Sequence, residues 1–142
     1  MRNRILTFQN LLPMKTPTMS QTSLLSTLWV FVLFNMIFRD LHQFLNPVAF
    51  QEMRSYHFSE TQVLLFGFML EIPVSMVLLS HVLPMKVNKW VNLFASLFTL
   101  LGALSTLPTA DMDDVFFTLI NLTALIAIGF TAWKLTDSRN TD

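Results

Sequence analysis

The sequence predicts an all-α fold: an integral membrane antiparallel four-helix bundle with both termini in the cytoplasm. Three observations lead to this prediction. The 142-residue chain is 53% hydrophobic and only 13% charged, whereas a soluble domain carries about 25% charged residues. Four segments are long and apolar enough to cross a bilayer, which takes about 20 residues each. Basic residues gather on one side of these segments, which sets their orientation.

The expected spans follow one another with short connections, so consecutive helices should be antiparallel neighbours. The predicted transmembrane domain covers 22–135, between an N-terminal tail (1–21) and a C-terminal tail (136–142), and its spans cover about 22–45, 61–83, 89–107 and 115–135. Proline follows each of the first three spans, where it stops a helix. These prolines are Pro47, Pro84 and Pro108.

Capping residues mark the starts of two spans. Ser59 and Gln62 have the spacing of a capping box at the second span. Asp111 can cap the fourth span, with Asp113 and Asp114 in its first turn, at the positive end of the helix dipole. The longest connection, 46–60, is expected to lie as an amphipathic turn on the outer membrane surface.

The positive-inside rule gives the orientation. The opposite loops carry one basic residue, Arg54, among acidic ones. If both termini are cytoplasmic, seven basic residues share the cytoplasmic side: Arg2, Arg4, Lys15, Lys86, Lys89, Lys134 and Arg139. The three tryptophans then lie towards the cytoplasmic ends of their spans, as in an interfacial belt. They are Trp29, Trp90 and Trp133.

Composition and spacing exclude several kinds of chemistry. The chain has no cysteine, so thiolate nucleophiles and cysteine-ligated metals are excluded. Its formal net charge is +0 without a basic face, which argues against nucleic-acid binding. His42 and His57 are expected on the outer side and His81 on the inner side, so the three cannot share a metal. We expect no metal and no cofactor, and a non-enzymatic protein with the lipid bilayer as its environment.

Every span carries polar residues spaced by three or four, and these should face the bundle interior. The third span's stripe of small and polar residues is expected to serve helix packing. The four stripes are Asn35, Arg39, His42 and Asn46; Gly67, Glu71 and Ser75; Asn92, Ala95, Ser96, Thr99, Gly102, Ala103 and Thr106; and Asp114, Thr118 and Asn121.

Glu71 is the polar residue that most needs an explanation. It lies about 15 Å into the second span, close to the midplane of a bilayer, where an ionisable side chain is costly. Pro73 is expected to kink the helix and free the Met69 carbonyl. Arg39 can either reach Glu71 or pair with an outer carboxylate, Asp40 or Asp114.

These residues define a candidate ligand or proton site with Glu71 at its centre. The expected site comprises Glu71, Arg39, Asn35, Asn92 and Asn121. A second group, the outer polar cluster, comprises Asp40, His42 and Asp114. A purely structural role is the alternative for the intramembrane Glu and Arg, whose side chains would then only hold neighbouring helices together.

Three functions follow from this pattern. The first is a membrane protein that binds a small molecule or a proton in its interior. The second is a structural or accessory subunit that docks through lipid-facing residues onto a larger membrane complex, with a membrane protein or copies of itself as partners. The third is a membrane enzyme acting on a quinone or lipid, which needs a cavity open sideways to the bilayer.

Two stretches, LWVFVLFNMIFRDLHQFLNP and LEIPVSMVLLSHVLPMKVNKWVN, resemble a family of small bacterial four-span membrane proteins of unknown function, distantly similar to the DoxX-like group. The residues that carry the resemblance are Asn35, Asp40, Glu71, Pro73, Ser80, Asn88, Trp90 and Asn92. The resemblance implies a multi-pass protein of the bacterial inner (plasma) membrane. It transfers no catalytic role to any residue.

Overall fold

The computed structural model describes residues 19–105 and 112–135, and all regular secondary structure within these ranges is helical. The helices are α2 (Gln21–Leu45), α3 (Pro47–Ser55), α4 (Glu60–Val82), α5 (Met85–Ser105) and α6 (Met112–Trp133). All except α3 are long and apolar enough to cross a membrane. The prediction of an all-α chain with four long apolar helices is therefore confirmed.

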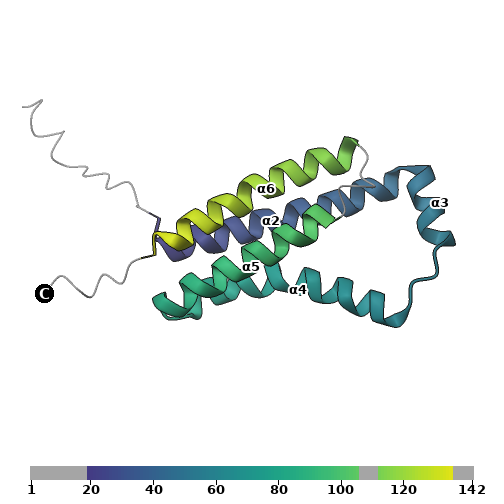
Figure 1. Ribbon diagram of the computed structural model, residues 1–142. Helices are drawn as coiled ribbons and strands as arrows, with labels where there is room; N and C mark the ends of the chain where they lie inside the picture. The colour runs from purple at the N-terminus through teal and green to yellow at the C-terminus, as the bar shows by residue number, and fades with distance from the viewer. Residues whose placement is uncertain (1–18, 106–111, 136–142) are drawn as a thin grey trace, which may run out of the picture.

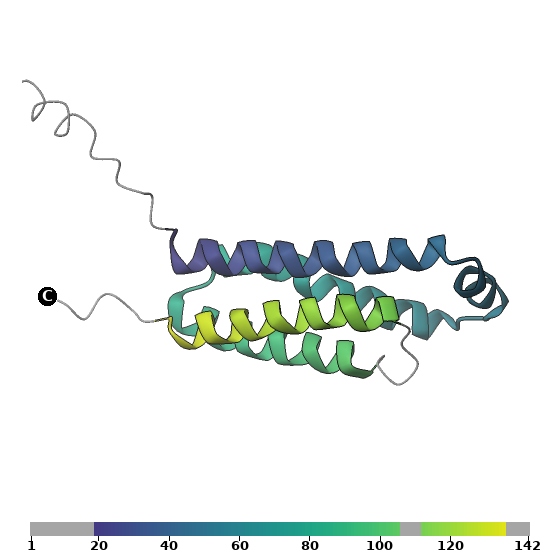
Figure 2. The ribbon, with the colours of Figure 1, turned by 90° about the horizontal axis from the view of Figure 1, so that it is seen from above.

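The four long helices lie side by side and successive ones run in opposite directions (Figures 1 and 2). α2 lies between α4 and α6, and α5 contacts α6 closely and α4 more loosely. The start of α2 and the end of α6 lie at one end of this assembly, and α3 lies at the other (Figure 1). We call the two halves the termini-side half (21–33, 72–82, 85–95 and 123–133) and the α3-side half (34–45, 60–71, 96–105 and 112–122).

Local sequence signals account for most helix ends. The predicted capping box of α4 is present, because Ser59 Oγ accepts from the Gln62 amide at 3.3 Å and Gln62 Oε1 accepts from the Ser59 amide at 2.9 Å. The expected turn at 46–60 instead contains helix α3 (Pro47–Ser55), which begins with proline as helices often do. α5 begins at Met85, directly after Pro84 and earlier than expected.

Some predictions lie outside the described residues. These are the cap at Asp111, the end of the third span at Leu107, its stripe residue Thr106, and almost all of both tails.

The two faces of α5 are the reverse of those of a helix in a soluble protein, because its buried face is polar and its exposed face is apolar. Its buried side chains are all polar: Asn88, Asn92, Ser96 and Thr99. Its exposed side carries large apolar residues: Phe94, Leu97, Phe98 and Leu101. The predicted polar stripe therefore faces the neighbouring helices, an arrangement typical of helices that associate in lipid.

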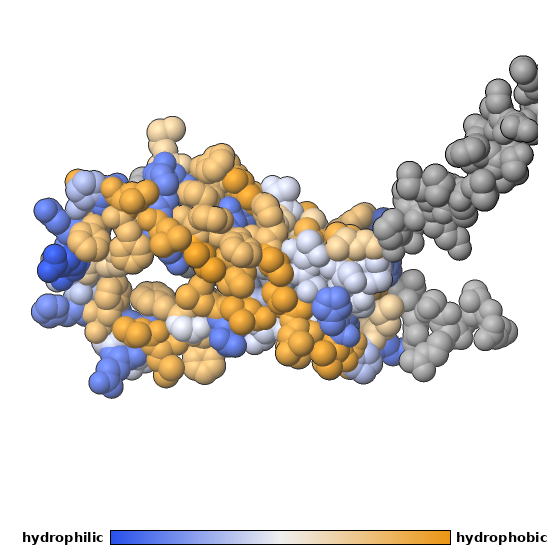
Figure 3. Space-filling view, turned by 180° about the vertical axis from the view of Figure 1, so that it is seen from behind, coloured by the Kyte–Doolittle hydropathy of each residue, from blue (hydrophilic) through white to orange (hydrophobic). Residues whose placement is uncertain are grey.

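The apolar core lies in the termini-side half and just beyond it. It consists of Leu25, Trp29, Val32, Met76, Ala124, Leu125, Ile128, Ala132 and Leu135. α4 continues without a break through the buried Pro73, and it changes direction near its middle (Figure 1). Its first half contributes no buried side chain. Figure 3 shows an opening through the molecule at the α3 end, bordered by hydrophobic surface.

Candidate functional site

Four polar side chains form a closed hydrogen-bonded group in the termini-side half, which we call the Asn92 cluster (Trp29, Ser80, Asn88 and Asn92). All four are fully buried. Asn92 Oδ1 accepts from Trp29 Nε1 at 2.7 Å and from Ser80 Oγ at 3.3 Å. Asn92 Nδ2 donates to Asn88 Oδ1 at 2.6 Å, and Asn88 Nδ2 donates to the Ser80 carbonyl at 2.7 Å. The cluster therefore joins α2, α4 and α5 with its donors matched to acceptors.

Two predictions change because of this cluster. Asn92 was expected beside Glu71, but its side chain bonds only within the cluster. Trp29 was expected in an interfacial belt, and this is wrong, because it shares its side of α2 with the buried Leu25 and Val32, four residues before and three after it. Trp90 and Trp133 are exposed, as a belt requires.

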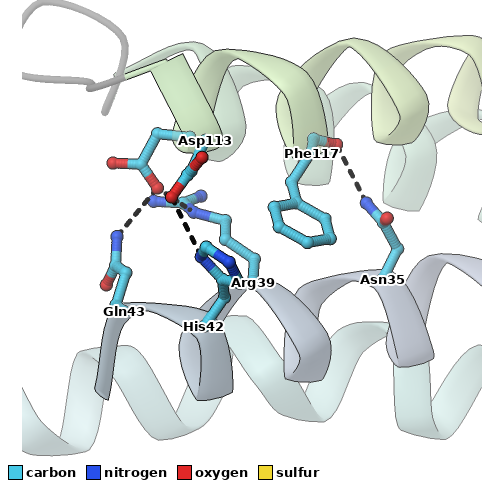
Figure 4. Close-up of polar contacts among 7 residues, drawn as sticks. Asn35, Arg39, His42, Gln43, Asp113 and Phe117 are labelled. Atoms are coloured by element: carbon cyan, nitrogen blue, oxygen red, sulfur yellow. Dashed lines mark hydrogen bonds and ion pairs between the residues drawn. The ribbon is translucent and has the colours of Figure 1, made fainter. Parts of the chain in front are cut away.

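The α3-side half contains an ion pair between α2 and α6. Arg39 Nε donates to Asp114 Oδ1 at 2.9 Å, and Gln43 Nε2 donates to the same oxygen at 2.8 Å (Figure 4). The side chains of Arg39 and Asp114 are 19% and 13% exposed. Of the three carboxylates considered for Arg39, the structure therefore pairs it with Asp114, and not with Glu71 or Asp40.

The other members of the outer polar cluster lie further out. His42 Nδ1 is 3.0 Å from Asp113 Oδ2, and both side chains are about half exposed, at 49% and 52% (Figure 4). Asp40 is exposed and makes no hydrogen bond or ion pair with the described residues. The cluster thus divides into an inner pair at Asp114, a rim contact at His42, and the Asp40 carboxyl, which lies within electrostatic range of Arg39 and Asp114.

Asn35 lies one helical turn from Arg39 on the inward side of α2. Its side chain is buried, and its Nδ2 donates to the Phe117 carbonyl at 2.9 Å (Figure 4). Asn35 and Arg39 therefore both attach α2 to the first turns of α6. The polar residues Asn35, Arg39 and Asp114 thus face a neighbouring helix, as expected for stripes that face the bundle interior.

Three buried side chains of the α3-side half have polar atoms without a hydrogen-bond partner among the described residues. These atoms are Thr99 Oγ1, Thr118 Oγ1 and Asn121 Oδ1, and each residue is more than nine-tenths buried. A threonine inside a helix can donate its hydroxyl to the carbonyl four residues earlier. Thr123 and Thr131, also on α6, do so at 2.9 and 2.7 Å. The unpaired hydroxyl of Thr118 is therefore a feature of its position and not of α6 as a whole.

Glu71 lies on the exposed surface of α4, so the prediction of an inward-facing acid is wrong. The buried residues of α4 are Pro73, Met76 and Ser80. At about 100° per residue, Glu71 is about 200° from Pro73 and so almost opposite the buried side. Its carboxyl accepts from Ser75 Oγ at 3.4 Å. Among its expected site partners, the structure brings none to Glu71.

Sequence reasoning missed several residues of these two groups. Ser80 and Asn88 carried the family resemblance without being assigned to a site, although Asn88 and Asn92 are spaced to share a helix face. Gln43 follows Arg39 by four residues, which places both on one face of α2. Within the described residues, no group of three His, Cys, Asp or Glu side chains is arranged to hold a metal ion.

These observations define the class of protein: within residues 19–105 and 112–135 the regular structure is all helical, with four helices able to cross a membrane and with polar side chains turned inward. The chain belongs to a family of unknown function (DUF6326), whose model matches residues 16–140. The expected resemblance to a family of unknown function is thereby confirmed, while the match shows no link to the DoxX-like group. No curated protein and no solved structure matches the chain significantly.

Proposed function

We propose that the chain is a non-enzymatic integral membrane protein that binds a small amphipathic molecule inside the α3-side half. The observation that carries this proposal is the set of unpaired buried atoms on Thr99, Thr118 and Asn121. Leaving such atoms without partners costs free energy, and a ligand that donates and accepts hydrogen bonds offsets this cost. This site replaces the one expected around Glu71.

The surroundings support an amphipathic ligand. Asn121 Oδ1 is an acceptor, so the polar end of the ligand must carry a donor such as a hydroxyl or amino group. The opening at the α3 end is bordered by hydrophobic surface (Figure 3), which suits an apolar body. In the same half, Asn35 and the Arg39–Asp114 pair tie α2 to α6.

Native mass spectrometry of the protein released from membranes tests this function. We expect a bound molecule on the wild-type protein, its loss in Asn121→Leu, and its retention in Thr131→Val, whose hydroxyl bonds within α6. An identical bound mass in Asn121→Leu, or none on the wild type in both vesicles and detergent, would overturn the proposal.

We infer that both termini lie in the cytoplasm and that the membrane is the bacterial inner membrane. The seven basic residues on the side of the termini support this orientation. The chain has no cysteine, so single-cysteine variants report one position each. A maleimide that does not cross membranes should label Gln51→Cys in intact cells and Ser138→Cys only after permeabilisation. The reverse pattern would contradict the orientation.

A further inference from the structure

The outward surface of α4 presents a carboxyl at the middle of the helix. Glu71 is the central residue of α4 (Glu60–Val82), so it lies about 17 Å from either end at 1.5 Å per residue. If α4 spans a membrane as proposed above, this carboxyl is at the depth of the lipid tails. It cannot reach the headgroups, because its side chain is far shorter than that distance.

The chain itself provides little to satisfy this carboxyl. Within the described residues its only hydrogen-bond partner is Ser75, at a long 3.4 Å. Arg39, the cation considered as its partner, is paired with Asp114 instead. Lipid tails carry no hydrogen-bond donor, and polar groups at this depth are costly unless another protein group meets them.

The surface around Glu71 is shaped for a neighbouring helix. Gly67, Glu71 and Ser75 follow one another at intervals of four and share one face of α4. A Cβ added at Gly67 would meet nothing within 4 Å, so this position is open to an approaching backbone. Beside Glu71 and Ser75 runs an otherwise apolar groove of about 280 Å³, lined by Phe68, Ile72, Met76 and Leu79.

α4 is also the least covered of the four long helices. Only 17% of its apolar window is buried, compared with 33% for α6. The exposed face of α4 therefore has both the apolar area and the polar group that a contact with another helix in the membrane would cover.

We propose that a second copy of this chain docks on α4 through Gly67, Glu71 and Ser75, and forms a two-fold symmetric dimer. A two-fold axis normal to the membrane brings the same patch of both copies together and keeps both Glu71 side chains at one depth. Each Ser75 hydroxyl can then donate to the Glu71 carboxyl of the other copy, so the two faces satisfy one another. Gly67 allows the close backbone approach that such helix pairs use.

This inference depends on the membrane placement proposed above but not on the ligand site. The two can therefore fail separately, because dimerisation is measured without any ligand.

The test measures energy transfer between donor- and acceptor-labelled Gln51→Cys copies in liposomes over a dilution series. We expect the wild type to dimerise and Glu71→Leu to weaken the dimer by about tenfold, the scale of an interhelical hydrogen bond in model peptides. Glu71→Gln keeps a donor and an acceptor, so it should retain the dimer. Gly67→Leu should weaken it as well, although the open space at Gly67 leaves the single chain undisturbed.

Leu65→Phe is the matched control, because Leu65 is exposed and lies about 200° from Gly67 around the helix. It should leave the dimer unchanged. A monomeric wild type at all dilutions, or a dimer unaffected by Glu71→Leu and Gly67→Leu, would overturn the proposal. A dimer lost equally in Glu71→Gln and Glu71→Leu would overturn the hydrogen-bonded contact, and a different protein bound to this face in place of a second copy would overturn the choice of partner.

Discussion

The two halves of the helix assembly differ in how they treat buried polar side chains. In the termini-side half, Asn92 binds Trp29, Ser80 and Asn88 in a closed group. In the α3-side half, polar atoms that are buried just as deeply have no partner among the described residues. Residue types are similar in both halves, so burial and polarity alone do not distinguish a structural contact from a binding site. What distinguishes the two is whether each buried donor and acceptor has a hydrogen-bond partner.

The termini-side half and the α3-side half also differ in how tightly their side chains pack. The apolar core lies in and next to the termini-side half, whereas the part of α4 before Glu71 contributes no buried side chain. A half that is closed by a core and a hydrogen-bonded cluster should be the stable part of the fold. Loosely packed elements open at lower free energy and commonly carry binding function.

Removing the centre of the Asn92 cluster should have the largest effect on stability. We expect Asn92→Leu to lower the free energy of unfolding by about 3 kcal/mol, because Trp29 Nε1 and Ser80 Oγ lose a buried acceptor. Unfolding in detergent micelles titrated with SDS gives this free energy. Thr123→Val, at an exposed site, serves as control. A loss no greater than the control's would show that the cluster does not hold the termini-side half together.

The Arg39–Asp114 pair should contribute less, because it is partly exposed. We expect a double-mutant cycle with Arg39→Gln and Asp114→Asn to give a coupling free energy of about 1 kcal/mol. Each single change should cost more than the coupling, since it leaves a charge at a site that is mostly buried. Additive single effects in the same SDS titration would mean that the two side chains do not interact in solution.

The sequence was sufficient for the elements that depend on composition and local chemistry. Long apolar runs and proline positions predicted four helices of spanning length, and Ser59 with Gln62 predicted the cap of α4. The inward stripes of α5 and α6 were also predicted, because small and polar residues recur there at helical spacing over several turns. In these cases a repeated pattern defines a face.

Single residues were placed less well. Glu71 was assigned to the interior on polarity alone, whereas the inward face of α4 is set by where Pro73, Met76 and Ser80 contact their neighbours. Trp29 was assigned to an interface by residue type, but Leu25 and Val32 turn that face of α2 into the core. Which partner a side chain meets depends on how two helices are rotated relative to each other, and no local pattern encodes this rotation.

The difference between the halves predicts that one polar substitution should stabilise the protein. Thr118→Val removes an unpaired buried hydroxyl with little change in shape, so we expect the free energy of unfolding of the ligand-free protein to rise by about 1 kcal/mol. Thr131→Val removes a hydroxyl that already bonds within α6 and should not stabilise. If Thr118→Val destabilises the ligand-free protein, the Thr118 hydroxyl has a hydrogen-bond partner in that state. The two halves would then not differ in the hydrogen bonding of their buried polar atoms.

The rim contact should give the smallest effect. His42 and Asp113 are about half exposed, so side-chain entropy and screening by salt offset most of their attraction. We expect His42→Gln to change the free energy of unfolding by less than about 0.5 kcal/mol at physiological salt. A loss of unfolding free energy as large as that from breaking the Arg39–Asp114 pair would show that the His42–Asp113 contact holds α2 and α6 together at the α3 end. The α3-side half would then be closed in solution, and entry of a ligand would require the His42–Asp113 contact to break first.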